Sequence, residues 1–181
     1  MNHADHVDLL REAVLNSGLE WADLGSGTGS FTLALADLLG PSGRIYSVDK
    51  DRGALREQER FMRARFPALA VTYIAGDFMR PLDLPPLDGI VMANALHFIA
   101  DRDKTAVMQR ITGYLRPGGR FVLVEYDVDH GNAWVPYPLT HQTWVELAGR
   151  CGLVEVRLVG QKPSRFLGRI YSAVGLTATR P

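Results

Sequence analysis

A glycine-rich run near the N-terminus constrains the fold more than any other feature of the sequence. Residues 25–30 read Gly-Ser-Gly-Thr-Gly-Ser and lie between a short apolar segment, 19–24, and the helical pattern of 31–39. Glycines in such a turn allow tight bends and let a ligand lie against the main chain. The helix that follows offers free N–H groups and a partial positive charge. The run therefore predicts a strand, a turn and a helix, with a ligand site at the turn.

The rest of the chain continues this alternation of strands and helices. Nearly unbroken apolar runs, such as 89–93, are typical of buried central strands. Three prolines argue against a full helix over 80–88, and Pro117-Gly118-Gly119 predicts a turn that leads into the next buried strand. The further strands are expected at 44–48, 71–75, 89–93 and 121–125, and the helices at 5–17, 31–39, 55–66 and 102–115.

The C-terminal part of the sequence changes this rhythm. A polar and aromatic loop, 127–138, leads to a helix capped by Thr140, and strands follow at 153–159 and 170–177. These last strands are too close for a helical crossover, so they pair antiparallel. The sequence therefore predicts one α/β domain over residues 1–181. Its expected fold is Rossmann-like and doubly wound, with a mostly parallel seven-stranded sheet and a C-terminal antiparallel β-hairpin.

Composition excludes several classes of function. The 20 basic and 20 acidic residues cancel, so no overall field attracts nucleic acid. No run of about 18 apolar residues predicts a transmembrane helix, and the first residues do not resemble a secretory signal. Cys151 is the only cysteine, which favours the reducing cytoplasm and a buried structural thiol. The five histidines show no metal-ligand spacing, so we expect no metal.

The spacing of the glycines sharpens the prediction. A dinucleotide-binding turn needs a third glycine at position 30, where this chain has Ser30. The pattern Asp23-x-Gly25-x-Gly27-x-Gly29 instead resembles the nucleotide-binding loop of class I S-adenosylmethionine-dependent methyltransferases. The resemblance extends from residue 19 to 177. It implies that S-adenosylmethionine is the cofactor, and that the loop residues Asp23, Gly25, Ser26, Gly27 and Gly29 contribute to its site.

Other expected cofactor-binding residues lie at the ends of the next strands. Asp49 ends the second strand, where a carboxylate can accept both hydroxyls of a ribose, and Lys50 is adjacent. The alternative is a solvated acid in the charged segment 49–52.

The third and fourth strands end in further candidates. The resemblance implies that Asp77 meets the adenine amino group and that Phe78 packs against the ring, whereas a turn cap and a core residue are the alternatives. Asn94 and Ala95 match positions that contact the methionine moiety. Ala95 and Leu96 replace the prolines of an Asn-Pro-Pro motif, which argues against nucleic-acid or amide substrates.

Methyl transfer requires few catalytic residues. An activated methyl donor needs alignment with its acceptor and exclusion of water, and an acceptor that carries a proton also needs a base. His97 and His141 are the catalytic candidates, and Glu125 and His130 are further possible bases. A histidine that only packs and hydrogen-bonds is the alternative for His97.

The expected acceptor is a small molecule. The predicted acceptor pocket lies beyond the fifth strand, although a surface loop anchored by its aromatic side chains is an equal alternative. Its expected residues are His97, Tyr126, His130, Trp134, Tyr137 and His141.

Two other functions compete with a methyltransferase. An NAD(P)-dependent oxidoreductase shares the strand–glycine–helix turn. Its Tyr-x-x-x-Lys motif matches Tyr46 and Lys50, but these residues fall at a strand end rather than on a helix. The second is a non-catalytic module that binds the cofactor or a partner. A second subunit could also complete the acceptor pocket, which would make a homodimer functional.

Overall fold

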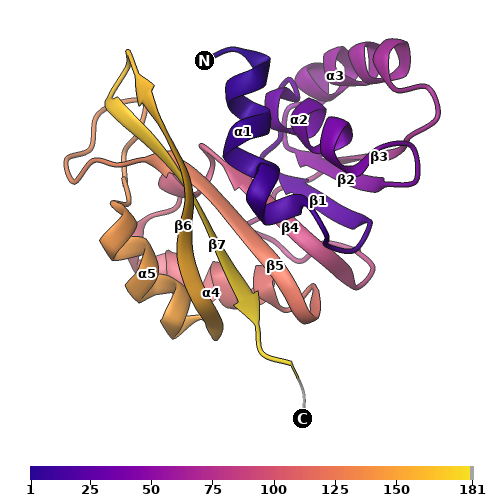
Figure 1. Cartoon of the computed structure of the whole chain (residues 1–181). Coiled ribbons are helices and arrows are strands. Elements are labelled where there is room, and N and C mark those ends of the chain that lie inside the picture. Colours follow the sequence, from indigo (N-terminus) through magenta and orange to yellow (C-terminus); the bar gives the residue numbers. More distant parts are fainter. Residues whose placement is uncertain (180–181) are drawn as a thin grey trace.

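The computed structural model describes residues 1–179 and contains the expected alternation of elements (Figure 1). The strands are β1 (Glu20–Leu24), β2 (Arg44–Asp49), β3 (Ala70–Ala75), β4 (Leu87–Ala93), β5 (Leu115–Tyr126), β6 (Leu153–Ser164) and β7 (Gly168–Thr177). The helices are α1 (His3–Val14), α2 (Ser30–Leu39), α3 (Arg52–Arg65), the 3₁₀ turn η1 (Leu96–Phe98), α4 (Asp101–Thr112) and α5 (His141–Arg150). The short η1 turn is the one element among them that the sequence patterns did not predict.

One seven-stranded sheet organises the structure, in the order β3-β2-β1-β4-β5-β7-β6. The strands β1 to β5 pair parallel with one another. β7 pairs antiparallel with both β5 and β6, so the predicted C-terminal hairpin is confirmed. The hairpin is longer than expected, because β6 continues to Ser164 rather than ending near Val159.

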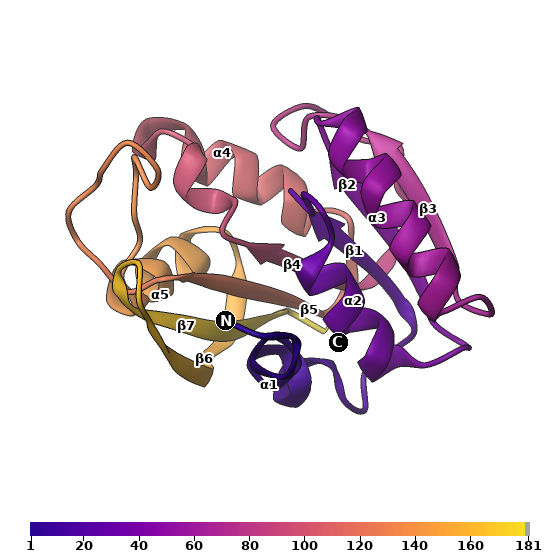
Figure 2. The same cartoon turned by 90° about the horizontal axis from the view of Figure 1, so that it is seen from above.

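Helices cover both faces of the sheet (Figure 2). Successive side chains of a strand point to opposite faces. In β5, Val122 packs with α1, α2 and α3, whereas Phe121 packs with α4 and α5. Trp144 of α5 lies 5.4 Å from the Phe121 ring, between ring centroids. Cys151, which follows α5, is buried in the same layer, as predicted for a structural thiol.

The start of β5 differs from the sequence prediction. Residues 117–119 were expected to form a turn before the strand, but they lie within β5. The pairing with β4 passes from Leu87↔Leu115 to Gly89↔Arg120, so the extra residues of β5 bulge out of the ladder. Gly118 has a φ of +75°, which a residue with a side chain rarely adopts. The glycine thus permits a bulge within β5 where a turn before the strand was expected.

The strand order creates a crevice at one edge of the sheet. From β1 the chain passes to β2 and β3 on one side, and later to β4 on the other side. Ligands in open α/β sheets bind outside the carboxyl ends of the strands at such a switch point. No helix within residues 1–179 is long and apolar enough to cross a membrane.

Candidate functional site

The glycine-rich loop is fixed by the end of the neighbouring strand. The backbone N–H groups of Gly25 and Ser26 both donate to the carbonyl oxygen of Val48, at 2.8 and 3.1 Å. Gly25 has a φ of +80°, and a Cβ atom there would lie 2.7 Å from the Cβ of Ala95. A side chain at position 25 would therefore be strained and would clash with the segment after β4.

Asp49 connects the glycine-rich loop to the segment after β2. Its Oδ2 atom accepts a hydrogen bond from the N–H of Gly27 at 2.8 Å, and its Oδ1 atom accepts from the N–H of Asp51 at 2.8 Å. Its position at the carboxyl end of β2 agrees with the expected one. The carboxylate therefore orders the loop and also faces the cavity described next.

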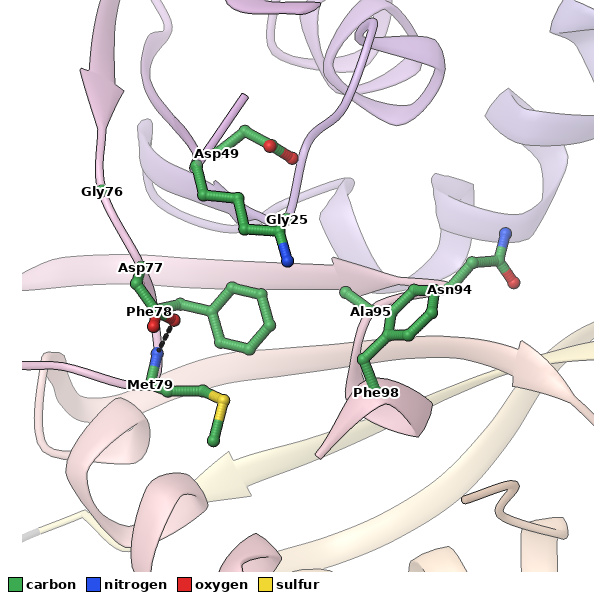
Figure 3. Close-up of a pocket in the computed structure, with 10 residues that line it drawn as sticks. Gly25, Asp49, Gly76, Asp77, Phe78, Met79, Asn94, Ala95 and Phe98 are labelled. Atoms are coloured by element: carbon green, nitrogen blue, oxygen red, sulfur yellow. Dashed lines mark hydrogen bonds between the residues drawn. The ribbon is translucent and has the colours of Figure 1, made fainter. Parts of the chain in front are cut away.

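A cavity of about 290 Å³ lies at the carboxyl ends of β1 to β4 (Figure 3). The rings of Phe78 and Phe98 lie beside it, and Asp49 and Asp77 contribute its acidic groups. Its lining residues are Gly25, Asp49, Lys50, Gly76, Asp77, Phe78, Met79, Asn94, Ala95 and Phe98. The expected cofactor residues of β2, β3 and β4 thus come together here, although they are far apart in the sequence.

A second cavity, of about 250 Å³, adjoins the first one at Gly25 and Asn94, which line both. Asp23 and the rest of the glycine-rich loop form one side of it. His6 of α1 and Phe31 of α2 also line it, with their rings 4.8 Å apart between centroids. The two cavities together follow the crevice from the loop to the end of β3.

Two residues that line the second cavity each have a buried oxygen atom without a hydrogen-bond partner among residues 1–179, namely Oδ1 of Asp23 and Oδ1 of Asn94. The other carboxylate oxygen of Asp23 accepts a bond from the hydroxyl of Thr32 at 2.6 Å. Burial raises the pKa of Asp23 to about 7, with a smaller contribution from the negative charge of Asp49, while the Thr32 bond opposes the shift. Buried oxygens without donors are costly, so they indicate a site for a ligand that supplies N–H groups.

Asn94 also has an unusual backbone. Its φ of +51° lies in the left-handed region, which asparagine tolerates better than most residues. Its N–H donates to the carbonyl of Val124 at 2.8 Å, which fixes this turn at the end of β4. Such strain is found preferentially at functional sites, consistent with the position of Asn94 between the two cavities.

The segment after β3 combines a turn with the cavity wall. Oδ1 of Asp77 accepts a hydrogen bond from the N–H of Met79 at 2.9 Å, so Asp77 does cap a turn. Asp77 and Phe78 nevertheless both line the larger cavity, and Phe78 also packs on the apolar core. The turn cap at Asp77 and the core packing of Phe78 are therefore compatible with a role in binding adenine. That role stays a prediction.

His97 and Glu125 form a buried pair next to the larger cavity. The Nδ1 atom of His97 lies 2.7 Å from Oε2 of Glu125, and the backbone N–H of His97 donates to Oε1 at 3.2 Å. The His97 ring lies 4.3 Å from the ring of Phe98 and 6.5 Å from that of Tyr126, between centroids. Two of the expected base candidates are thus partners of each other.

Comparison with known proteins identifies the family. The profile of a family described as methyltransferase domain matches residues 22–119 of the chain. The chain belongs to this family. The matched region includes the glycine-rich loop and the carboxyl ends of β1 to β4, so it contains all residues that line the larger cavity and all but His6 of those that line the smaller one. This assignment removes the oxidoreductase from consideration.

Relatives and solved structures agree with this assignment. Carboxy-S-adenosyl-L-methionine synthase of Chromohalobacter salexigens is 32% identical over 133 residues, which cover 71% of this chain and 49% of that protein. Acetylserotonin O-methyltransferase of Mus musculus is 34% identical over 120 residues, which cover 61% of this chain and 29% of that protein. The chain thus spans half or less of the length of these two relatives.

A solved structure shares the fold over almost the whole chain. The 1,6-didemethyltoxoflavin-N1-methyltransferase of Burkholderia thailandensis has a TM-score of 0.75 and 18% identity. The match covers 98% of this chain and 80% of that one, and that structure contains 1,6-didemethyltoxoflavin and S-adenosylhomocysteine. At this identity the likeness shows the Rossmann-like fold expected from the sequence.

The other expected acceptor residues are spread over the segment after β5. Tyr126 is half-buried beside His97, but Trp134 is 73% exposed and His130 points into solvent. The N–H of Tyr137 donates to the carbonyl of His97 at 3.0 Å, and its side chain is exposed. The methyltransferase domain therefore brings Tyr126 and the backbone of Tyr137 to His97, and it leaves His130 and Trp134 on the surface.

His141 begins α5 and lies in a different environment from His97. Its ring packs edge-on against Tyr171 at 5.7 Å between centroids, and its Nε2 atom is buried without a partner. Its N–H donates to Oδ1 of Asp127 at 3.1 Å. None of these contacts reaches either cavity, and the predicted catalytic role of His141 stays a prediction.

Several residues that line the site or lie beside it were not predicted from the sequence. Phe98 and Met79 adjoin predicted residues, so the apolar side chains after each strand were an available signal. His6 and Phe166 had no such signal, because α1 and the tip of the β6–β7 hairpin reach the edge of the sheet only through packing. Phe166 makes an edge-on contact with Tyr126, at 5.6 Å between ring centroids.

Proposed function

We propose that this chain binds S-adenosylmethionine in the two adjoining cavities and transfers its methyl group to a small-molecule acceptor. The transfer is a direct in-line displacement. The observation that carries the proposal is the pair of buried, unpartnered oxygens of Asp23 and Asn94 beside a glycine-rich loop. An adenosyl amino acid offers an ammonium group to such oxygens, whereas a smaller nucleoside does not.

The residues present suit the parts of this cofactor. The carboxylate of Asp49 would accept the ribose hydroxyls, and Phe78 and Asp77 would meet the adenine ring, all in the larger cavity. The ammonium group would lie in the smaller cavity at Asp23 and Asn94. Gly25 lines both cavities, so a ligand that spans them would lie against its backbone. Lys50 lies at the rim of the larger cavity and is exposed.

The sulfonium of S-adenosylmethionine supplies a methyl group that is already activated. The chain therefore needs to orient the acceptor and to keep water away from it. Ala95 and Phe98, which follow β4, form an apolar part of the wall of the larger cavity. A small acceptor is supported by one relative, acetylserotonin O-methyltransferase, and by the solved 1,6-didemethyltoxoflavin-N1-methyltransferase, since acetylserotonin and 1,6-didemethyltoxoflavin are small molecules.

Calorimetry tests the proposal. S-adenosylmethionine and S-adenosylhomocysteine are expected to bind, and NADH is not. Asp49→Ala should weaken binding by about 2–4 kcal/mol, because hydrogen bonds to a charged carboxylate are lost. Asp103→Ala, which changes an exposed carboxylate of α4, is the matched control and should bind as the wild type does.

Each contrary result has a definite meaning. Binding of NADH alone would overturn the proposal, and full affinity in Asp49→Ala would overturn the assignment of the ribose site. Binding without turnover on any phenolic, enolic or amine acceptor would favour the non-catalytic module. A homodimer that completes the acceptor site remains a prediction, which sedimentation of the protein with and without cofactor would test.

A further inference from the structure

The buried pair of His97 and Glu125 has a fixed geometry. Glu125 is fully buried near the end of β5, and His97 lies in η1, directly after the adjacent strand β4. One carboxylate oxygen contacts Nδ1 of the ring and the other accepts the backbone N–H of the same residue. Both carboxylate oxygens are therefore used to hold a single histidine, and rotation of its ring would break the first of these bonds.

This arrangement determines which ring nitrogen is available. A carboxylate accepts hydrogen bonds only, so Nδ1 carries the hydrogen in the neutral ring and Nε2 carries the free electron pair. Nε2 has no hydrogen-bond partner among the described residues, and the His97 side chain is 3% exposed. His97 thus keeps a ring nitrogen with a free electron pair, while Glu125 holds the other ring nitrogen.

Aromatic rings lie beside the His97 ring. The Phe98 ring is tilted by 52° against it, is 59% exposed and lines the larger cavity. Tyr126 lies 6.5 Å from the His97 ring between centroids, and Phe166 from the hairpin tip is 51% exposed and packs edge-on against Tyr126. Apolar walls with one or two polar groups are typical of small-molecule sites. Exposed aromatic faces also pack well against a flat ligand.

We propose that the acceptor is a flat, aromatic or enolic molecule with an acidic O–H or N–H group, and that Nε2 of His97 removes its proton. The bond from hydrogen to the acceptor atom breaks, the electron pair stays on that atom, and the proton forms a bond with Nε2. The resulting imidazolium faces the carboxylate of Glu125, which stabilises the positive charge. This inference rests on the proposed function, because the electron pair released is the one that the methyl group takes up.

The position of the pair relates the base to the cofactor site. Phe98 lines the larger cavity, and its ring also lies against the His97 ring. An acceptor that rests on Phe98 and Tyr126 therefore has its acidic hydrogen at the base and its ring next to the cavity. The alternative is a purely structural pair, in which Glu125 only holds η1 in place.

Binding of 4-nitrophenol separates these two readings. The phenolate form of this probe absorbs visible light and the phenol form does not, so its protonation state in the site is measured directly. The wild type, saturated with S-adenosylhomocysteine, should bind the probe as phenolate and lower its apparent pKa by at least one unit. His97→Asn keeps an N–H donor for Glu125 but lacks the base, and it should bind the probe without this shift.

Two further variants keep the test decisive. His3→Asn removes a histidine of α1 that pairs with Asp37 and should leave the probe unchanged. Glu125→Gln keeps the base but removes the charge that stabilises imidazolium, so the shift should fall at least severalfold even if His97→Asn does not fold. Equal apparent pKa values of the bound probe in the wild type, folded His97→Asn and Glu125→Gln would overturn the inference, as would a wild type that does not bind the probe.

The proposed function is tested separately from the role of His97 as a base. Calorimetry with S-adenosylhomocysteine on the same samples measures the cofactor site without any acceptor. Wild-type protein that binds the cofactor but does not shift the probe refutes the base alone. Wild-type protein that does not bind the cofactor refutes the proposed function, whatever the probe shows.

Discussion

The two halves of the ligand-binding edge are built in different ways. At the ends of β1, β2 and β3, polar groups are tied to backbone atoms, as in the bonds from Gly25 to Val48 and from Gly27 to Asp49. At the carboxyl ends of β4 and β5 and the tip of the β6–β7 hairpin, aromatic side chains lie near the buried pair of His97 and Glu125, and several of them are exposed. We call the first the loop half and the second the aromatic half.

The difference separates binding of the cofactor, which needs a fixed site, from binding of the acceptor, whose site can vary. The loop half has a fixed shape, since backbone hydrogen bonds and glycine conformations leave it little freedom. The aromatic half recognises a ligand through exposed rings and a single polar atom, so its preference can change with a few side chains. Substitutions in the loop half should therefore act on cofactor binding, and those in the aromatic half on the acceptor.

The largest effect is expected for Gly25→Val in the loop half. A left-handed backbone costs a residue with a side chain about 1–2 kcal/mol, and overpacking against Ala95 and Phe78 adds about 1–3 kcal/mol. Thermal unfolding should show this loss, and calorimetry should show that affinity for S-adenosylhomocysteine falls more than tenfold.

The matched control is Gly149→Val on α5, where an added Cβ meets no atom within 4 Å. It should retain the wild-type affinity. Equal affinity of Gly25→Val and Gly149→Val would contradict the idea that the loop half is rigid.

A smaller effect is expected for Asp23→Asn. This substitution should increase the stability of the protein and weaken binding of the cofactor. Burial disfavours the ionised carboxylate, so the wild type loses stability as pH rises from about 4 to about 7, and the loss is complete above that range. The shift of the pKa from 3.8 to about 7 corresponds to at most about 4 kcal/mol. We expect Asp23→Asn to raise the free energy of unfolding at pH 8 by about 1–3 kcal/mol, because the neutral amide removes the buried charge and its added N–H groups offset only part of that gain.

The same substitution should weaken binding of the cofactor. The ammonium group favours the ionised carboxylate, so wild-type affinity should increase as pH rises through about 7, and Asp23→Asn should lose this increase. Urea unfolding and calorimetry between pH 5 and pH 8 measure both effects, with the exposed Asp103→Asn as control. A destabilised Asp23→Asn with unchanged affinity would show that Asp23 is a structural residue.

The smallest effect is expected for Phe166→Ala in the aromatic half. The side chain is half exposed, so the free energy of unfolding should change by less than about 1 kcal/mol. The dissociation constant of 4-nitrophenol should rise severalfold because one wall of the site is lost, whereas S-adenosylhomocysteine should bind as before. Phe61→Ala on α3, with 55% exposure, is the control. If Phe166→Ala changed the affinity for S-adenosylhomocysteine and not that for 4-nitrophenol, the distinction between the two halves would be wrong.

Most of the fold and the loop half followed from local patterns in the sequence. Apolar periodicity located the strands, and the spacing of Gly25, Gly27 and Gly29 indicated the turn. Asp49 could be placed at the carboxyl end of β2 because a strand end is a local property. The bulge at Gly118 was mistaken for a turn, because glycine permits both and only the pairing with β4 decides between them.

The aromatic half could be predicted only in part. His97 and Glu125 were separate candidates in the sequence, and nothing local indicated that residues 28 positions apart share a hydrogen bond. Phe166 had no signal at all, since its contact with Tyr126 depends on the length of the β6–β7 hairpin. Trp134 and His130 were expected near the acceptor, but the structure leaves both exposed.

The sequence by itself determined the order of strands and helices, the glycine-rich turn and the carboxylate at the end of β2. These features depend on backbone conformation and on the period of apolar residues, which are set by neighbours along the chain. Tertiary structure alone decided that Glu125 faces His97, that the unpartnered oxygens of Asp23 and Asn94 share one cavity, and that Phe166 reaches Tyr126. Such contacts join different elements, and they follow from the register of the sheet and the packing of whole elements rather than from the preference of any single residue.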